Sequence, residues 1–242
     1  MTGIIQNFDR AVAGYEANST AQAALAQALA QWIAPGERRG HAVEFGAGTG
    51  LFTRQMTLWR GTYHATDAAP QMVQRGKMLA SKANWQIADA RQPDGLGPAD
   101  WIFACNLLQW LDEPASVLRS WRKILRPGGQ MAVAVLLPGT FEELQTVLPE
   151  TSPLRWCGAE EWRGLLERAG FSLERMESWK HVEIYPNALT LLRAVHAMGL
   201  APQRKVGAGK LRAALRAYDK KFVGRGGVRA TWQAWLARGR AV

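Results

Sequence analysis

Strand and helix patterns alternate five times between residues 41 and 137, and this alternation limits the fold more than any other feature of the sequence. The last expected strand, Met131 to Leu137, is apolar throughout. A strand that is apolar on both faces is buried on both faces, as in a parallel sheet covered by helices. We therefore expect an α/β chain with a doubly wound, Rossmann-like, mainly parallel sheet. The other strands are expected over 41–45, 62–67, 85–89 and 100–105, and the helices over 51–58, 70–80 and 114–125.

The order of elements changes after residue 138. Helices are expected near 140–148, 159–169, 187–199 and 208–222, and strands near 171–185 and 228–237. Before the alternation, Ser19 and Gln22 form a capping-box pattern for a helix that ends near Ile33. We expect a single domain over 1–242, with a helical segment over 1–36, a helical insertion after the fifth strand within 138–226, and an antiparallel last strand.

The positive charge is concentrated at the carboxyl end. The chain has 242 residues and a net charge of +10. The stretch from Arg204 to Arg240 holds eleven basic residues and one acid, Asp219, so it accounts for the whole excess. An acidic partner is expected to meet this end of the molecule. No apolar run long enough for a membrane span and no leader pattern is present, and two cysteines make no disulfide framework, so we expect a cytoplasmic protein without a membrane partner.

A glycine-rich string, Glu44-Phe-Gly-Ala-Gly-Thr-Gly50, lies between an expected strand and an expected helix. Glycines there let a ligand approach the backbone closely. Dinucleotide sites use G-x-G-x-x-G, and here the third glycine comes one residue too early. The carboxylate of Glu44 would repel a phosphate, but it can hold an ammonium group. The pattern favours S-adenosylmethionine over a dinucleotide, and a plain tight turn is the alternative.

Two further acids end the next two expected strands. Asp67 can accept both hydroxyls of a ribose, and Asp89, followed by Ala90, can accept the amino proton of an adenine. Asp67 could instead cap the helix that begins at Pro70, and Asp89 could be an acid in a surface turn. Acids at the carboxyl ends of three consecutive strands are the stronger signal, because ligands bind at that edge of open α/β sheets.

These residues, with an expected tight turn at Arg126-Pro-Gly-Gly129 before a buried strand, resemble the class I S-adenosylmethionine-dependent methyltransferases over about residues 40–137. Further strings extend the resemblance to the malonyl-acyl-carrier-protein O-methyltransferases of biotin synthesis. They are Phe8 to Tyr15 with Gln22, Asn106-Leu-Leu-Gln-Trp110, Leu137 to Leu144, and Thr231 to Arg238. Methyltransferases of other small carboxylic acids share the Gln-Trp segment.

The resemblance implies a site. Its cofactor residues would be Tyr15, Glu44, Gly46, Ala47, Gly48, Gly50, Asp67, Ala68, Met72, Asp89, Ala90, Cys105 and Asn106. Tyr15, Trp110 and Arg155 would position the acceptor, with 1–36 over the cofactor and 138–226 on the substrate side. Cys105 stands where the family usually has asparagine, so either Cys105 or Asn106 takes that role. A carboxylate acceptor is already ionised and needs no general base. The four histidines lie far apart in the sequence, and we expect no metal.

The expected acceptor is the free carboxylate of malonyl-acyl-carrier protein, and the basic segment 204–229 would dock that acidic carrier. We expect a monomer. Another small acid or natural product is the alternative acceptor. A nucleic-acid methyltransferase is less favoured, because the tail lacks interleaved aromatic residues, and a non-catalytic binding module is disfavoured by the intact acids.

Overall fold

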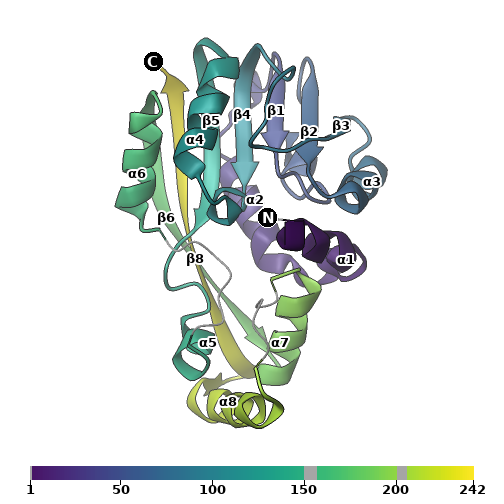
Figure 1. The fold of residues 1–242 in the computed structure, drawn as a ribbon, viewed down its shortest axis with the longest axis vertical. Coiled ribbons are helices and arrows are strands. Elements are labelled where there is room, and N and C mark those ends of the chain that lie inside the picture. Colours follow the sequence, from purple (N-terminus) through teal and green to yellow (C-terminus); the bar gives the residue numbers. More distant parts are fainter. Residues whose placement is uncertain (1, 150–156, 201–205) are drawn as a thin grey trace.

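The computed structural model describes residues 2–149, 157–200 and 206–242, and a mixed sheet lies at its centre (Figure 1). In these residues eight strands run in the order β3-β2-β1-β4-β5-β8-β6, with β7 paired to β8. Strands β1 to β5 are parallel, and β8 is antiparallel to β5 and β6. This confirms the expected sheet and its antiparallel last strand. The strands are β1 Ala42–Phe45, β2 Tyr63–Asp67, β3 Asn84–Ile87, β4 Ala99–Cys105, β5 Leu125–Leu136, β6 Phe171–Tyr185, β7 Val223–Gly224 and β8 Gly227–Ala241.

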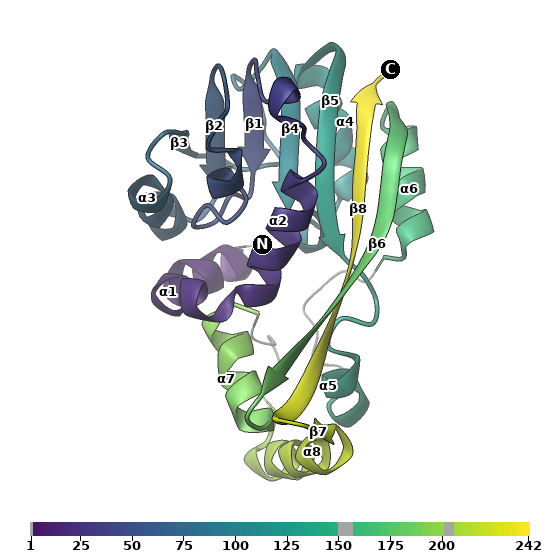
Figure 2. The same cartoon turned by 180° about the vertical axis from the view of Figure 1, so that it is seen from behind.

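Helices cover both faces of the sheet. Helices α4 and α6 lie on the face turned to the viewer in Figure 1, and α2 lies on the face seen in Figure 2. Helix α3 packs beside β2 and β3 at one edge. The helices are α1 Thr2–Asn18, α2 Thr20–Ala30, α3 Pro70–Leu79, α4 Pro114–Ile124, α5 Glu142–Val147, α6 Ala159–Arg168, α7 Ala188–Ala197 and α8 Ala208–Lys221, with 3₁₀ turns η1 Pro35–Glu37, η2 Thr53–Met56 and η3 Leu108–Trp110.

The alternation of side chains along β4 shows how the sheet is buried on both of its faces. Trp101 and Phe103 belong to the hydrophobic cluster on the α2 side, whereas Ile102 and Ala104 belong to the cluster on the α4 and α6 side. Successive residues of a strand point to opposite faces, so a strand buried on both must be apolar at every position. The residues of β5 alternate between the same two clusters, which explains why the run from Met131 to Leu137 is apolar throughout.

Strands β6 and β8 continue far beyond the parallel strands, as a long antiparallel pair that carries α5, α7 and α8 (Figures 1 and 2). Buried Glu143 of α5 accepts hydrogen bonds from the Thr231 backbone N–H at 3.0 Å and its hydroxyl at 2.6 Å, which fixes α5 to β8. Asp219 of α8 accepts from the backbone N–H of Ala188 at 2.6 Å, at the start of α7. Helix α7 also packs against α1, so the extension reaches the amino-terminal helix.

Three local expectations were wrong. Over 51–58 the chain forms only the 3₁₀ turn η2, in which the Thr53 hydroxyl bonds Glu44 and the Arg54 guanidinium bonds Glu16. The capping box is not formed: Ser19 precedes α2 but makes no capping bond, since its backbone (φ −99°, ψ 37°) is not extended. The turn at 126–129 lies within β5 as an irregularity, where the pairing register with β4 shifts.

Candidate functional site

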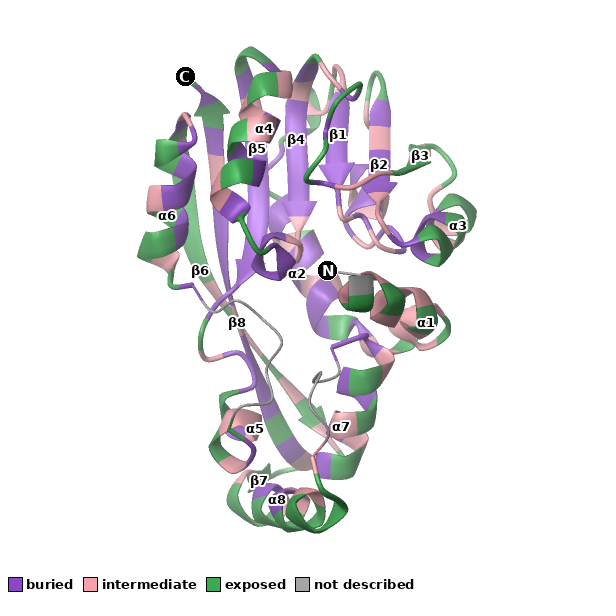
Figure 3. Cartoon of the chain, in the orientation of Figure 1, coloured by how far each residue is buried: buried purple, intermediate pink, exposed green. Residues whose placement is uncertain are grey.

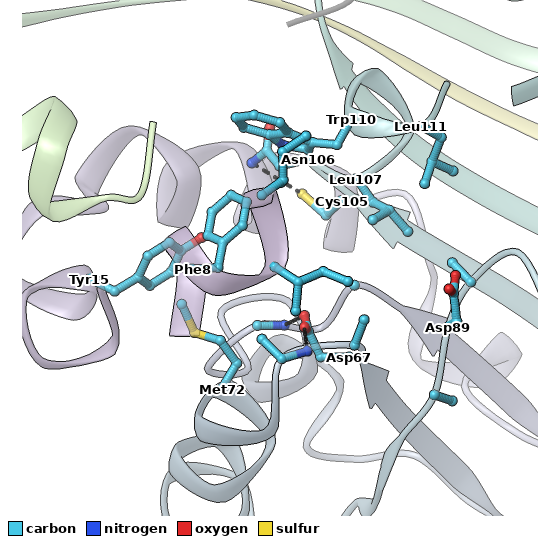
Figure 4. A pocket seen from close by; sticks show the side chains of 18 residues that line it. Phe8, Tyr15, Asp67, Met72, Asp89, Cys105, Asn106, Leu107, Trp110 and Leu111 are labelled. Carbon is cyan, nitrogen blue, oxygen red and sulfur yellow. Dashed lines mark hydrogen bonds between the residues drawn. The ribbon is translucent and has the colours of Figure 1, made fainter. Parts of the chain in front are cut away.

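A pocket opens at the carboxyl ends of the parallel strands (Figure 4). It encloses about 750 Å³, including the part open to solvent, which is within the size range of small-molecule sites. A smaller pocket of about 280 Å³ shares several of its walls. The larger pocket is lined by Tyr15, Gly46, Gly48, Asp67, Ala68, Met72, Asp89, Ala90, Cys105, Asn106 and Trp110 from the sequence-based set; Glu44 and Ala47 line the smaller one.

The glycines of the loop after β1 have different surroundings. Gly48 has a positive φ of 57°, and a side chain there would meet no atom within 4 Å, so its backbone faces open space in the pocket. Gly50 has φ of 93°, and a Cβ would lie 3.2 Å from the ring of Trp85. Gly50 does not line either of these two pockets, and it allows close packing against Trp85.

Asp67 stands at the end of β2 with both carboxylate oxygens held by the backbone. Its Oδ2 accepts from the N–H of Gly48 and its Oδ1 from the N–H of Ala69, both at 2.8 Å. Burial raises the pKa of Asp67, and the backbone N–H donors oppose this. Each oxygen can accept more than one hydrogen bond, so Asp67 can tie the glycine loop to α3 and still accept hydroxyl groups from the pocket.

Asp89 lies in the turn after β3, at the end of the pocket away from Tyr15 (Figure 4). It is not in the strand itself, which ends two residues earlier than expected. The guanidinium of Arg91 bonds both of its oxygens at 2.9 and 3.0 Å through Nε, and this pairing lowers the pKa of Asp89. The neighbouring Ala90 carbonyl accepts the indole N–H of buried Trp121 at 2.7 Å, which fixes the turn against the core.

Glu44 is buried in β1, with 1% of its surface exposed. Its Oε2 accepts from the hydroxyls of Thr53 at 2.7 Å and Tyr63 at 2.8 Å. Burial raises the pKa of Glu44 to about 7, although these two hydrogen bonds oppose the rise. Gln22 and Asn106 line the same small pocket, and within the described part of the chain Gln22 Oε1 and Asn106 Oδ1 have no hydrogen-bond partner. The small pocket is therefore rich in hydrogen-bond acceptors, and one of them is the carboxyl group of Glu44, whose pKa is about 7.

Helix α1 forms the wall opposite the strand ends. Phe8 packs edge-on against Trp110, with ring centroids 5.2 Å apart, and lies 6.4 Å from Tyr15 (Figure 4). Asp9 accepts from the N–H of Gln71 at 2.7 Å, at the start of α3, and Glu16 pairs with Arg54 at 3.0 Å. Asp9 and Glu16 thus hold α1 against α3 and η2. Burial also raises the pKa of the Tyr15 phenol, so its hydroxyl keeps its proton near neutral pH.

Cys105 and Asn106 both line the larger pocket, so both have access to a bound cofactor. Burial raises the pKa of Cys105, so it is a neutral thiol. Asn106 has a left-handed backbone with φ of 62°, and its amide donates only to Cys105 Sγ, at 3.9 Å. Arg155, expected to hold the acceptor, lies outside the described residues.

Several lining residues were not expected as site residues. They are Ile4, Ile5, Phe8, Ala69, Ala88, Leu107 and Leu111. Phe8 was in the quoted amino-terminal string, but its role depends on α1 folding across the strand ends, which periodicity does not reveal. The described residues contain no cluster of three or more His, Cys, Asp or Glu that could hold a metal ion. In the same ranges no helix is long and apolar enough to cross a membrane.

The chain is similar to known methyltransferases. Residues 43–131 match the family model of a methyltransferase domain. The chain is 30% identical to the biotin biosynthesis bifunctional protein BioCD of Bordetella avium (strain 197N) over 90% of its length, and spans 49% of that longer protein. It is 27% identical to the malonyl-acyl-carrier-protein O-methyltransferase of Paenibacillus sp. (strain JDR-2), over 97% of this chain and 96% of that protein.

The fold has solved counterparts. Magnesium protoporphyrin IX methyltransferase from Synechocystis PCC 6803, with bound S-adenosylhomocysteine, superposes with a TM-score of 0.57 at 13% identity. The match covers 91% of this chain and 83% of that one, and at this identity it shows the fold alone. The matched domain, the relatives and the fold together show that the chain carries an S-adenosylmethionine-dependent methyltransferase domain.

Proposed function

We propose that the chain transfers the methyl group of S-adenosylmethionine to the free carboxylate of malonyl-acyl-carrier protein, an early step of biotin synthesis. The observation that carries this proposal is the similarity to the Paenibacillus enzyme, which runs over nearly the whole of both chains and includes the acceptor-side elements after β5. Similarity confined to the cofactor half would support only a methyltransferase of unspecified acceptor.

The described residues fit the cofactor. The acceptor-rich small pocket around Glu44, Gln22 and Asn106 suits the ammonium group of a methionine, which is a donor only. Asp67 would accept the ribose hydroxyls. At the far end of the pocket, Asp89 and Ala90 would meet the adenine. Gly46, Ala47 and Gly48 leave the loop backbone close to the ligand, and Ala68 and Met72 supply apolar walls.

Bound S-adenosylmethionine supplies a methyl group already activated by its sulfonium. The protein then needs to bring a carboxylate oxygen in line with that methyl group and exclude water. The Tyr15 hydroxyl would donate a hydrogen bond to the carboxylate, because burial keeps the phenol protonated. The indole N–H of Trp110 is a second candidate donor in the same wall. Neither residue removes a proton, since the acceptor is already ionised.

The acceptor carboxylate also calls for a cation. None of the described residues that line the larger pocket is lysine, arginine or histidine. Arg155 therefore stays our candidate, because an arginine fork matches a carboxylate and the residue lies in the segment between α5 and α6.

We propose that the basic segment 204–229 docks the acidic carrier protein. Helix α8 presents Lys210, Arg212, Arg216, Lys220 and Lys221 to solvent, and its outer surface is largely exposed (Figure 3). The helix is fixed to the domain by buried Ala214 and Tyr218, on the side opposite to Arg212, Arg216 and Lys220. Arg212, Arg216 and Lys220 are spaced i, i+4, i+8 and so form one stripe. We further propose that the enzyme acts as a monomer in the cytoplasm.

The proposed function is tested by complementation. The gene is expressed in a bacterial biotin auxotroph that lacks its malonyl-carrier methyltransferase, beside a Glu44→Ala, Asp67→Ala variant as the cofactor-binding control. Growth without biotin, with the wild type alone, is the expected result. Failure of an expressed and folded wild type to restore growth would point to another carboxylic acid as the acceptor.

A further inference from the structure

The amide of Gln109 is a buried polar group with no hydrogen-bond partner among the residues that the structure describes. The residue lies in η3 with 1% of its surface exposed, and neither its Nε2 nor its Oε1 makes a hydrogen bond. The large majority of buried side-chain amides are hydrogen-bonded, because a buried donor loses its water without compensation. A group left unsatisfied in the free protein is one whose partner arrives with a ligand or as an ordered water.

The position of Gln109 points to the acceptor as that ligand. The segment Asn106–Leu111 follows β4, and its other polar residue, Asn106, lines both pockets. Leu107 and Trp110, which flank Gln109, line the larger pocket. Trp110 packs on Phe8 of α1, so this turn and α1 together enclose the place where the methyl group would meet its acceptor.

The turn begins at a residue whose side chain makes few contacts. Asn106 has a left-handed backbone, its N–H donates to the Ala134 carbonyl at 2.9 Å, and its side-chain amide contacts Cys105 Sγ at 3.9 Å. Within the turn, the N–H groups of Trp110 and Leu111 bond carbonyls of the turn itself. Gln109 lines neither pocket, so its amide would reach a ligand only if this turn shifts.

We propose that Gln109 is an acceptor-binding residue, whose side-chain NH2 group donates a hydrogen bond to an oxygen of the acyl acceptor when the turn closes on it. This rests on the proposed function. A carboxylate has two oxygens, so the amide can hold one of them while the proposed cation holds the other. The unsatisfied amide of the free protein is then completed by substrate.

The test uses Gln109→Met, which removes the amide and keeps the volume. The matched control is Gln145→Met, because the Gln145 amide is satisfied by the Thr140 carbonyl at 2.8 Å. For each full-length variant we would measure the melting temperature without ligands, the Kd of S-adenosylhomocysteine, and KM and kcat with malonyl-acyl-carrier protein. Gln109→Met is expected to melt at or above the wild-type temperature, to bind S-adenosylhomocysteine within twofold, and to raise KM at least tenfold. Gln145→Met is expected to lower the melting temperature and leave KM unchanged.

Two outcomes overturn the inference. An unchanged KM in Gln109→Met would mean that the amide does not meet the acceptor. A melting temperature that falls as it does in Gln145→Met would mean that an ordered water already satisfies the amide in the free protein. Failure of the proposed function is separate: the wild type would then bind S-adenosylhomocysteine but leave malonyl-acyl-carrier protein unmethylated, while the melting temperatures would still report on the amide.

Discussion

The stability of the cofactor-free protein should depend on pH through Glu44. Burial raises the pKa of this carboxyl from 4.5 to about 7. Because the folded protein then binds the proton more tightly than the unfolded chain, the contribution of this group to stability falls as pH rises between these two values. One pKa unit corresponds to about 1.4 kcal/mol, so the buried charge costs about 3 kcal/mol at pH 8 and about 1 kcal/mol at pH 5.

Glu44→Gln removes this dependence and keeps an oxygen that can accept the hydroxyl hydrogens of Thr53 and Tyr63. In urea unfolding at a series of pH values, the variant should gain about 2 kcal/mol on the wild type between about pH 5 and 8. Asp89→Asn is a control in which the change in stability with pH should have the opposite sign. Arg91 lowers the pKa of Asp89, so that variant should be less stable than the wild type at neutral pH, and the difference should vanish as pH falls through the lowered pKa. If the Glu44→Gln and wild-type curves stay parallel, Glu44 is ionised throughout and the reasoning from burial fails.

Three further results are expected. Asp67→Ala should weaken S-adenosylhomocysteine binding, measured by calorimetry, by about 1.5–3 kcal/mol, the range for hydrogen bonds to charged groups; an unchanged affinity with a much lower melting temperature would make Asp67 structural. Arg212→Glu with Arg216→Glu should raise KM for malonyl-acyl-carrier protein by roughly one to two orders of magnitude, less so at high salt, and spare malonyl-coenzyme A; equal loss on both acceptors would argue against docking. Trp121→Phe keeps a ring to stack on Phe45 but leaves the Ala90 carbonyl without its donor, so urea unfolding should show a loss of about 1–3 kcal/mol, and no loss would mean that another donor replaces the indole.

The sheet was predictable from the sequence because its signals are local. Apolar runs mark β4 and β5, and the acids and glycines at strand ends mark the ligand edge in any open α/β sheet. The ends of elements were less predictable. Asp89 was expected in a strand and lies in the turn beyond it, where Arg91 holds it.

The rest depended on contacts between distant segments. The partners of Glu44, namely Thr53 and Tyr63, lie 9 and 19 residues away, and the first of them lies in the 3₁₀ turn found where a helix was expected. Tyr218 was not expected as the buried anchor of α8, because its burial arises where the helix packs on α5 and α7, and its hydroxyl donates to the Arg229 carbonyl of β8 at 2.8 Å. Likewise, nothing in the local sequence shows that the Gln109 amide lacks a partner.

The central claim is methyl transfer to the carboxylate of a malonyl group on its carrier. The most direct measurement is mass spectrometry of purified malonyl-acyl-carrier protein after incubation with the enzyme and S-adenosylmethionine carrying a deuterated methyl group. Our account predicts one labelled methyl group per carrier, lost on mild ester hydrolysis and absent with acetyl-acyl-carrier protein, which has no free carboxylate. An unlabelled carrier in the presence of an enzyme that binds the cofactor would contradict the claim, as would equal labelling of the acetyl carrier.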